Sequence, residues 1–152
     1  MKGLVQRVSE ASVDVDGREI SRIGAGILLL LGVEQGDGQS EARELCRKIL
    51  TYRIFPDEAG RMNRSVLDTG GALLVVPQFT LVADTTSGTR PGFSRAAGPD
   101  VARDIYAAFL NLARTDMSAK RVQEGCFGAD MKVSLINDGP VTFMLSTRER
   151  RR

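Results

Sequence analysis

The sequence predicts a single α/β domain: a mixed, mostly antiparallel β-sheet with a barrel-like core and two main helices. Short alternating or apolar runs recur along the chain, and two segments carry an apolar stripe with the period of a helix. No linker, repeat or low-complexity stretch divides these segments. The length of 152 residues suits one domain that buries about two thirds of the surface of its unfolded chain.

The N-terminal part of the chain is predicted to supply most of the sheet. Residues 4–8, 12–15 and 18–23 have strand patterns, and Asp16-Gly17 is a tight-turn signal between the last two. The apolar run 27–33 is typical of a central strand that is covered on both faces.

A first helix is predicted after a glycine-rich loop at residues 36–38, with Ser40 as its N-cap. Its apolar residues recur at helical spacing, so one face is expected to pack on the sheet. These residues are Ala42, Leu45, Cys46, Ile49 and Leu50. Cys46 is therefore expected to be a small core residue and not a reactive thiol. A short strand over 53–55 and a polar loop over 59–65 follow.

The middle of the chain predicts a buried strand, a long loop and a second helix. The strand covers 72–76, and residues 85–98 are rich in Gly, Ser, Thr and Pro, which is typical of a loop that carries function. Within it, Arg90-Pro91-Gly92-Phe93 is interpreted as a loop with a hydrophobic anchor or as an RNA contact. Gly98-Pro99 then starts the second helix. Its expected core face consists of Val101, Ile105, Ala108, Phe109 and Leu112.

The last strand is predicted to be interrupted by a proline. Residues 131–136 and 141–145 both have strand patterns, and Gly139-Pro140 lies between them. Proline has no backbone N–H, so pairing must stop or end there, and nearby carbonyl groups become free to face another molecule. An ordinary hairpin turn is the alternative interpretation.

The composition excludes several kinds of catalytic site. The chain has no histidine, so it cannot contain a Ser-His-Asp or Cys-His arrangement or an imidazole ligand for zinc. Two separated cysteines cannot make a structural zinc site unaided, and no phosphate-binding glycine loop is present. Any chemistry is expected to depend on backbone groups and a few polar side chains, without a metal or a cofactor.

The charged residues are mainly arginines, with 17 arginines against 4 lysines and a net charge of +2. The planar guanidinium suits phosphate contacts, so nucleic acid is a candidate partner, and genomic codon bias is the alternative explanation. Residues 147–152 are predicted as a basic tail that follows a domain over 1–146. This tail is either solvated or in contact with phosphates.

The N-terminal and apolar segments give an expectation about location. The longest apolar run, Ile27 to Leu31, is too short to cross a bilayer, and the first residues do not form a secretory signal. A cytoplasmic protein without a membrane partner is therefore expected.

Two features are candidates for a site. Pro77 stops a strand ladder, so the N–H groups of Phe79 and Thr80 could stabilise an oxyanion, with Gln78 as a neutral donor and acceptor. A plain strand exit with Phe79 and Leu81 in the core is the alternative. Thr80 has no evident base that would make it a nucleophile. Arg7 is interpreted as a surface charge or as a group that holds backbone carbonyls.

Together these features resemble the D-aminoacyl-tRNA deacylase family, whose members remove D-amino acids from tRNA. The resemblance extends from Met1 to Leu145, and its motifs occur in the same order as in the family. They are Gln6-Arg7-Val8, Ala11-Ser12-Val13, Gly32-Val33-Glu34-Gln35-Gly36-Asp37, Gly60-Arg61-Met62-Asn63, Gln78-Phe79-Thr80-Leu81, Arg90-Pro91, Phe127-Gly128-Ala129-Asp130-Met131 and Asn137-Asp138-Gly139-Pro140-Val141-Thr142.

The resemblance implies a homodimer with two active sites at the subunit interface and an aminoacyl-tRNA substrate. Gly139-Pro140, joined by a cis peptide bond, would enter the partner's pocket, where its carbonyls would reject an L side chain and accept the α-amino group. Glycine misacylated onto tRNA would also be accepted as a substrate, because it has no side chain for these carbonyls to reject. The implied catalytic residues are Gln78, Phe79 and Thr80, and the implied substrate-binding residues are Arg7, Pro77, Asn137, Gly139, Pro140 and Thr142.

Pro77 departs from the family, which usually has serine at this position. A related branch that edits L-alanine on tRNA has proline there, but it differs at the positions of Phe79 and Arg7. Because this chain keeps both residues, it is expected to be D-specific. Editing of L-alanyl-tRNA and a non-catalytic tRNA-binding module are the alternatives.

Overall fold

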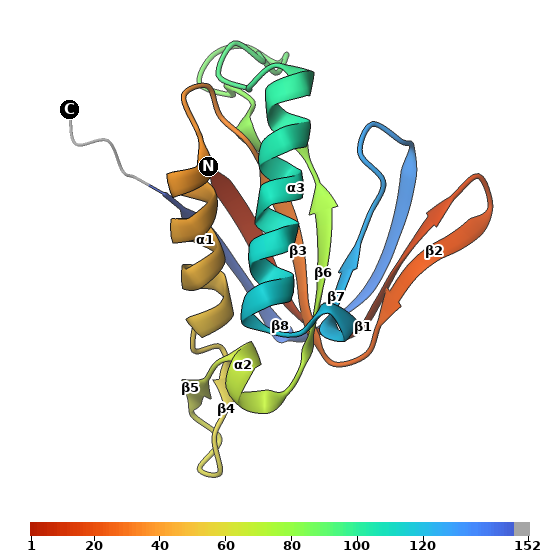
Figure 1. The fold of residues 1–152 in the computed structure, drawn as a ribbon, viewed down its shortest axis with the longest axis vertical. Helices are drawn as coiled ribbons and strands as arrows, with labels where there is room; N and C mark the ends of the chain where they lie inside the picture. Colours follow the sequence, from red (N-terminus) through yellow and green to blue (C-terminus); the bar gives the residue numbers. More distant parts are fainter. Residues whose placement is uncertain (148–152) are drawn as a thin grey trace.

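A six-stranded mixed sheet forms the centre of the computed structural model, which describes residues 1–147 (Figure 1). The strands of this sheet are β1 (Lys2–Val15), β2 (Arg18–Ile23), β3 (Gly26–Gly32), β6 (Ala72–Pro77), β7 (Val122–Glu124) and β8 (Met131–Ser146). A separate hairpin contains β4 (Phe55–Pro56) and β5 (Met62–Arg64). The helices are α1 (Gln39–Thr51), α2 (Val66–Thr69) and α3 (Pro99–Asp116), with short 3₁₀ helices η1 (Phe79–Val82) and η2 (Ala119–Arg121). Residues 148–152, predicted as part of a basic tail, lie outside the described residues.

β1 organises the sheet. Its first half pairs with β3 and its second half with β2, while β8 pairs along its whole length on the other side. These pairings are antiparallel, whereas β3, β6 and β7 are parallel to one another. The sheet is therefore mixed and mostly antiparallel, as predicted, and it curves into a nearly closed, barrel-like form (Figure 1).

The sheet separates two hydrophobic cores. On β6, Leu73 and Val75 belong to the larger core with α1 and α3, whereas Leu74 and Val76 belong to a smaller core inside the curve. This division follows from the alternation of side chains along a strand. It explains why β3 and β6 are apolar without interruption. A central strand covered on both faces was predicted for the run 27–33.

The buried stripe of α1 is confirmed, since all five predicted residues, Cys46 among them, are buried. Burial raises the pKa of the Cys46 thiol to about 12, so the group stays protonated, as expected of a core residue. The predicted N-cap was wrong. The helix is capped at Gly38, whose N–H donates to Glu41 Oε2 at 2.8 Å, and the Ser40 hydroxyl donates to the same carboxylate at 2.9 Å.

The core face of α3 is rotated from the predicted one. Ile105 and Phe109 are buried as expected, but the side chain of Val101 is 52% exposed. Tyr106 is buried instead, because its hydroxyl reaches the sheet and donates to the Val75 carbonyl at 2.9 Å. Leu110 and Ala113 complete the buried face.

Several short elements, η1 and η2 among them, were not predicted, and two predicted strands are joined into one. The predicted strands 4–8 and 12–15 are parts of one continuous strand, β1. β8 pairs with both parts, and two register shifts lie between Gln6 and Glu10. The predicted loop over 59–65 contains β5. α2 and β7 have only 4 and 3 residues, too few for a periodic pattern to show.

β8 leaves the ladder at the predicted proline. Gln6 pairs with Thr142 and Val8 with Asn137, so residues 138–141 lie outside the pairing opposite Arg7. These four residues are called the 138–141 excursion below. Across residues 1–147, no helix combines the length and the apolar character needed to cross a membrane.

The corrected face of α3 can be tested by truncating one buried and one exposed side chain. Phe109→Ala should lower the free energy of unfolding by about 3–5 kcal/mol, because it leaves a cavity in the larger core. Val101→Ala, on the exposed side of the same helix, should change it by less than about 0.5 kcal/mol. Urea denaturation measures both values, and similar losses for the two variants would contradict the observed face.

Candidate functional site

The predicted site residues form two groups that lie at different ends of the sheet. The first, called the η1 group, comprises Pro77, Gln78, Phe79 and Thr80, at the end of β6. The second, called the excursion group, is built around the 138–141 excursion. Its members are Arg7, Asn137, Gly139, Pro140 and Thr142.

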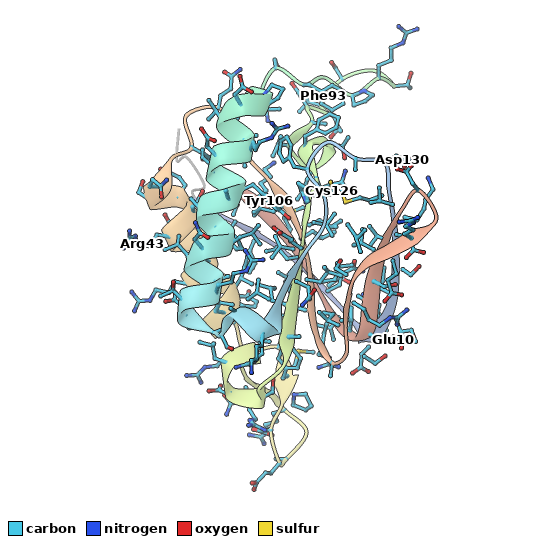
Figure 2. The ribbon with its side chains drawn as sticks, turned by 45° about the vertical axis from the view of Figure 1, so that its right-hand side comes forward. Glu10, Arg43, Phe93, Tyr106, Cys126 and Asp130 are labelled. Carbon is cyan, nitrogen blue, oxygen red and sulfur yellow. The ribbon has the colours of Figure 1, made fainter. Side chains whose placement is uncertain are left out.

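The strand register shows that one chain does not bring the two groups together. Pro77 is paired with Leu31, at the end of β3, whereas Arg7 is paired with Ile27, near its start. This offset corresponds to roughly 13 Å along the strands. β8 also lies on the side of β1 away from β3 and β6. In Figure 2, Phe93 lies near the top of the view and Glu10 of β1 lies well below it, on the right.

The η1 group forms because the chain leaves the sheet at Pro77. The N–H of Gln78 donates to the Leu31 carbonyl at 2.8 Å, and the chain then turns into η1. The first residues of a helix have N–H groups with no acceptor in that helix. Phe79 and Thr80 therefore present backbone donors at an exposed position, an arrangement that can stabilise an oxyanion.

Within the η1 group, Pro77 and Gln78 are half-buried, whereas Phe79 and Thr80 are exposed. The alternative that places Phe79 in the core was therefore wrong, and Leu81 is half-buried. Phe79 is 62% exposed and packs against Phe93, with ring centroids 5.2 Å apart. Phe93 is itself 41% exposed, so it is not a buried anchor of its loop. The Gln78 amide donates to the Thr80 hydroxyl. Within residues 1–147, no basic side chain is hydrogen-bonded to that hydroxyl.

The loop that carries Phe93 is closed by backbone hydrogen bonds. Asp84 and Gly92 exchange two of them, at 2.7 and 2.9 Å. The Asp84 carboxylate accepts from the hydroxyl and the N–H of Thr86, and these bonds lower the pKa of Asp84. Asp84 is thus held as a carboxylate that supports the loop. In residues 1–147, no three or more Cys, Asp and Glu side chains are grouped to hold a metal ion.

Asn137 closes the base of the excursion. Its Oδ1 accepts from the Val141 N–H at 2.8 Å, and its Nδ2 donates to the Thr142 hydroxyl at 2.8 Å. Gly139 has a φ of +134°, which favours glycine, and the Gly139-Pro140 peptide bond is cis. A Cβ atom at Gly139 would lie 2.9 Å from Arg7 Nη2 and 2.7 Å from Val141 Cγ2. The tip of the excursion is therefore restricted to glycine.

Arg7 holds the excursion from one side. Its Nε donates to the Asp138 carbonyl at 3.0 Å and its Nη1 to the Ile54 carbonyl at 2.8 Å. The side chain is only 13% exposed. Of the two interpretations of Arg7, the one in which it holds backbone carbonyls is confirmed. Ile54 could not be recognised as a partner of Arg7 from the sequence, because the acceptor is a backbone carbonyl that every residue has.

Exposed apolar side chains flank the excursion on both sides. They are Leu135, Ile136, Phe143 and Met144, all on β8. Within the described residues, β8 pairs only with β1, so its other edge is open. A long strand edge with exposed apolar residues is unusual in a monomer and is typical of an interaction surface.

Comparisons with known proteins show to which family the chain is similar. Residues 4–146 match the family model described as D-Tyr-tRNA(Tyr) deacylase. A D-aminoacyl-tRNA deacylase of Marinobacter nauticus is 66% identical over 99% of this chain and 96% of its own length. One from a Ruegeria species is 56% identical over the same shares. The solved structure of c-Myc DNA Unwinding Element Binding Protein has a TM-score of 0.94 and 42% identity, covering 97% of this chain and 99% of that chain.

The role of Asn137 can be tested through the amide that it holds. Asn137→Ala should speed hydrogen exchange of the Val141 N–H at least about tenfold, because that group loses its acceptor. Native-state exchange followed by NMR provides the measurement. Ser134→Ala, on the same strand, is the control and should leave the Val141 rate unchanged, and equal rates in all three proteins would contradict the assignment.

Proposed function

The chain belongs to the D-Tyr-tRNA(Tyr) deacylase family, and from this premise we propose that it hydrolyses the ester bond between tRNA and a D-amino acid or misacylated glycine. The observation that carries the proposal is the presence of both motif groups on the surface, each held by its own hydrogen bonds. Aminoacyl-tRNA is made in the cytoplasm, where we place the protein.

The proposed active site is shared between two subunits. One chain keeps the η1 group and the excursion group apart, whereas a two-fold dimer would bring the excursion of one subunit to the η1 group of the other. The exposed apolar residues of β8 support this arrangement, because an interface through this edge would cover them and place both excursions at the contact.

The proposed selectivity depends on the backbone of the excursion. Arg7 and Asn137 fix its base, while Gly139 and Pro140 are exposed. In the partner's pocket, their carbonyl oxygens would accept the substrate's α-ammonium group and occupy the space that an L side chain needs. A D side chain points away from them, and glycine has no side chain to exclude.

The proposed reaction needs no side-chain nucleophile, because an aminoacyl ester is already activated. Water attacks the carbonyl carbon, with the terminal ribose 2′-OH assisting, while the N–H groups of Phe79 and Thr80 stabilise the oxyanion. The bond between the acyl carbon and the ribose 3′ oxygen breaks. The amino acid leaves as a carboxylate and the tRNA regains its hydroxyl. The Phe79 and Phe93 rings offer a surface for stacking the terminal base.

The first test compares chiral substrates. Purified protein should hydrolyse D-tyrosyl-tRNA and glycyl-tRNA at least about 100-fold faster than L-tyrosyl-tRNA, because an L side chain meets the excursion carbonyls. Release of labelled amino acid measures the rates. L-alanyl-tRNA is a further substrate: its rapid loss beside intact D-tyrosyl-tRNA would favour the sister activity.

Binding without turnover would instead favour the non-catalytic module, and Pro77→Ser is the matched variant for that outcome. Restored turnover in Pro77→Ser would show that Pro77 impairs the site. Equal hydrolysis of the D and L substrates, or of neither, would contradict the proposal.

The second test is subunit complementation. Phe79→Ala and Gly139→Ala each impair one of the two groups, so each protein alone should be nearly inactive. In a dimer that contains one chain of each kind, one of the two sites is fully wild-type if the site is shared. Refolding the two variants together should therefore restore about a quarter of the wild-type rate.

Co-refolding each variant with itself is the matched control and should restore nothing. A site made within one chain also predicts no recovery in the mixed sample, so absence of recovery, with mixed dimers verified by mass spectrometry, would contradict the shared site. Hydrolysis by the wild-type protein tests the reaction separately.

A further inference from the structure

The positive charge of the described chain is concentrated in one segment. Residues 43–64 contain six arginine and lysine side chains against three carboxylates, whereas the rest of residues 1–147 contains eleven against fifteen. These six exposed cations, called the basic surface below, are Arg43, Arg47, Lys48, Arg53, Arg61 and Arg64. The remainder of the described chain is acidic, so an anionic partner is attracted to this segment.

The basic surface begins on the exposed face of α1. Arg43 and Arg47 are four residues apart, so their side chains are neighbours on the helix. Arg43 points away from the body of the protein in Figure 2. Two like charges at this spacing destabilise a helix slightly, so this pair does not serve the stability of α1. The helix dipole accounts for Lys48, which lies in the last turn, but not for Arg43.

The basic surface continues onto the β4–β5 hairpin, which lies below α1 in Figure 1. Every residue of β5 is exposed, so this strand has no packed face. The turn of the hairpin is nevertheless well defined, because Asp57 Oδ1 accepts the N–H groups of Ala59 and Arg61 at 2.9 and 3.0 Å. An ordered surface segment that does not contribute to the core is typical of a contact with another molecule.

The cations of the basic surface are not neutralised by ion pairs. In the described part of the chain, none of them is paired with a carboxylate. Neutral oxygens orient two of them instead. Arg53 donates to Asn63 Oδ1 at 3.1 Å, and Arg64 donates to the backbone carbonyl of residue 68 at 2.8 Å. A neutral acceptor fixes the direction of a guanidinium group and leaves its charge available to a phosphate.

Arg7 joins the hairpin to the excursion. It donates to the carbonyl of Ile54, the residue before β4, and to the carbonyl of Asp138 in the excursion. In the proposed dimer the excursion enters the partner's site, so the hairpin beside it would lie at the edge of that site. An RNA strand whose end occupies the partner's site would therefore meet the basic surface of the chain that supplies the excursion.

We propose that the basic surface binds the sugar–phosphate backbone of the acceptor stem of the tRNA whose 3′ end lies in the partner's site. This inference rests on the proposed function and its shared site. Arginine suits phosphate because its planar fork donates two parallel hydrogen bonds, and five of the six cations are arginines. Contacts of this kind position a nucleic acid without reading its sequence, so the basic surface would bind tRNAs of different sequence.

The first experiment removes two of these charges. Arg47 and Arg61 form only backbone hydrogen bonds within the described residues, so Arg47→Gln with Arg61→Gln should leave the fold intact. Binding of deacylated tRNA is measured by fluorescence anisotropy between about 50 and 200 mM salt. The double variant should bind about tenfold more weakly at the lower salt. The slope of log K against log[salt] should become shallower by about 1.5–2, because each phosphate contact contributes about 0.7–0.9.

Arg18→Gln with Lys120→Gln is the matched control, because it also removes two exposed cations that have no ion pair among the described residues. Its affinity and its salt slope should equal those of the wild type, and melting temperatures verify that both double variants are folded. Equal losses in the two double variants would overturn the proposal. Retained tRNA affinity in Arg47→Gln with Arg61→Gln would also overturn it, and lost binding to phosphatidylserine vesicles would then assign the basic surface to a membrane.

A second experiment identifies the subunit that acts. Mixed dimers of Phe79→Ala and Gly139→Ala chains have one complete site, which takes its excursion from the Phe79→Ala chain. Arg47→Gln with Arg61→Gln placed on that chain should raise KM for D-tyrosyl-tRNA about tenfold, and the loss should appear in KM and not in kcat. The rise should be at least about fivefold larger than when the same substitutions are on the Gly139→Ala chain. The same effect from either chain would overturn the proposal.

The binding measurement needs no hydrolysis, so the two proposals can fail separately. Binding of tRNA that depends on the basic surface, without turnover of D-tyrosyl-tRNA, would contradict the proposed reaction alone. Hydrolysis by Arg47→Gln with Arg61→Gln at the wild-type KM would contradict the role of the basic surface alone.

Discussion

The guanidinium group of Arg7 is the interaction on which the excursion group depends. Pro140 lacks the N–H that would continue the ladder, and β1 and β8 are unpaired at Arg7, opposite the 138–141 excursion. The Arg7 side chain donates to two backbone carbonyls, that of Asp138 in the excursion and that of Ile54 just before β4. A mostly buried guanidinium is stable only with such acceptors, and the exposed excursion has a defined position only with such a donor.

The same gap explains why one chain cannot contain the whole proposed site. β8 pairs with β1 on both sides of the excursion, which fixes Gly139 and Pro140 at the open edge of the sheet. The η1 group lies beyond β3, at the other end of the strands. Bending the chain to join the groups would break the ladder that holds Arg7. The proposed second copy would keep this ladder intact.

Features that follow from local sequence patterns were predictable from the sequence, and features that depend on tertiary contacts were not. The stripe of α1 and the two-sided strands follow from apolar periodicity, and both proline interruptions follow from a missing N–H. The rotation of α3 was not visible, because Tyr106 and Val101 are both compatible with a core face and only the distance to Val75 decides between them. The contact of Arg7 with Ile54 and the pairing of Phe79 with Phe93 depend on tertiary positions in the same way.

In the proposed site, the groups that act on the substrate are backbone atoms, which substitution cannot remove. A carbonyl or N–H group changes only when the chain moves, so changes in selectivity must arise from residues that hold the backbone. Arg7, Asn137 and Gly139 have this role at the excursion, and Pro77 has it at the exit of β6. This is consistent with a chain that has no histidine, because a site that excludes substrates by shape requires rigid oxygens and not a titrating side chain. The proposed mechanism is also compatible with Pro77. Proline restricts the backbone at the end of β6, and the attack by water needs no side-chain hydroxyl at this position.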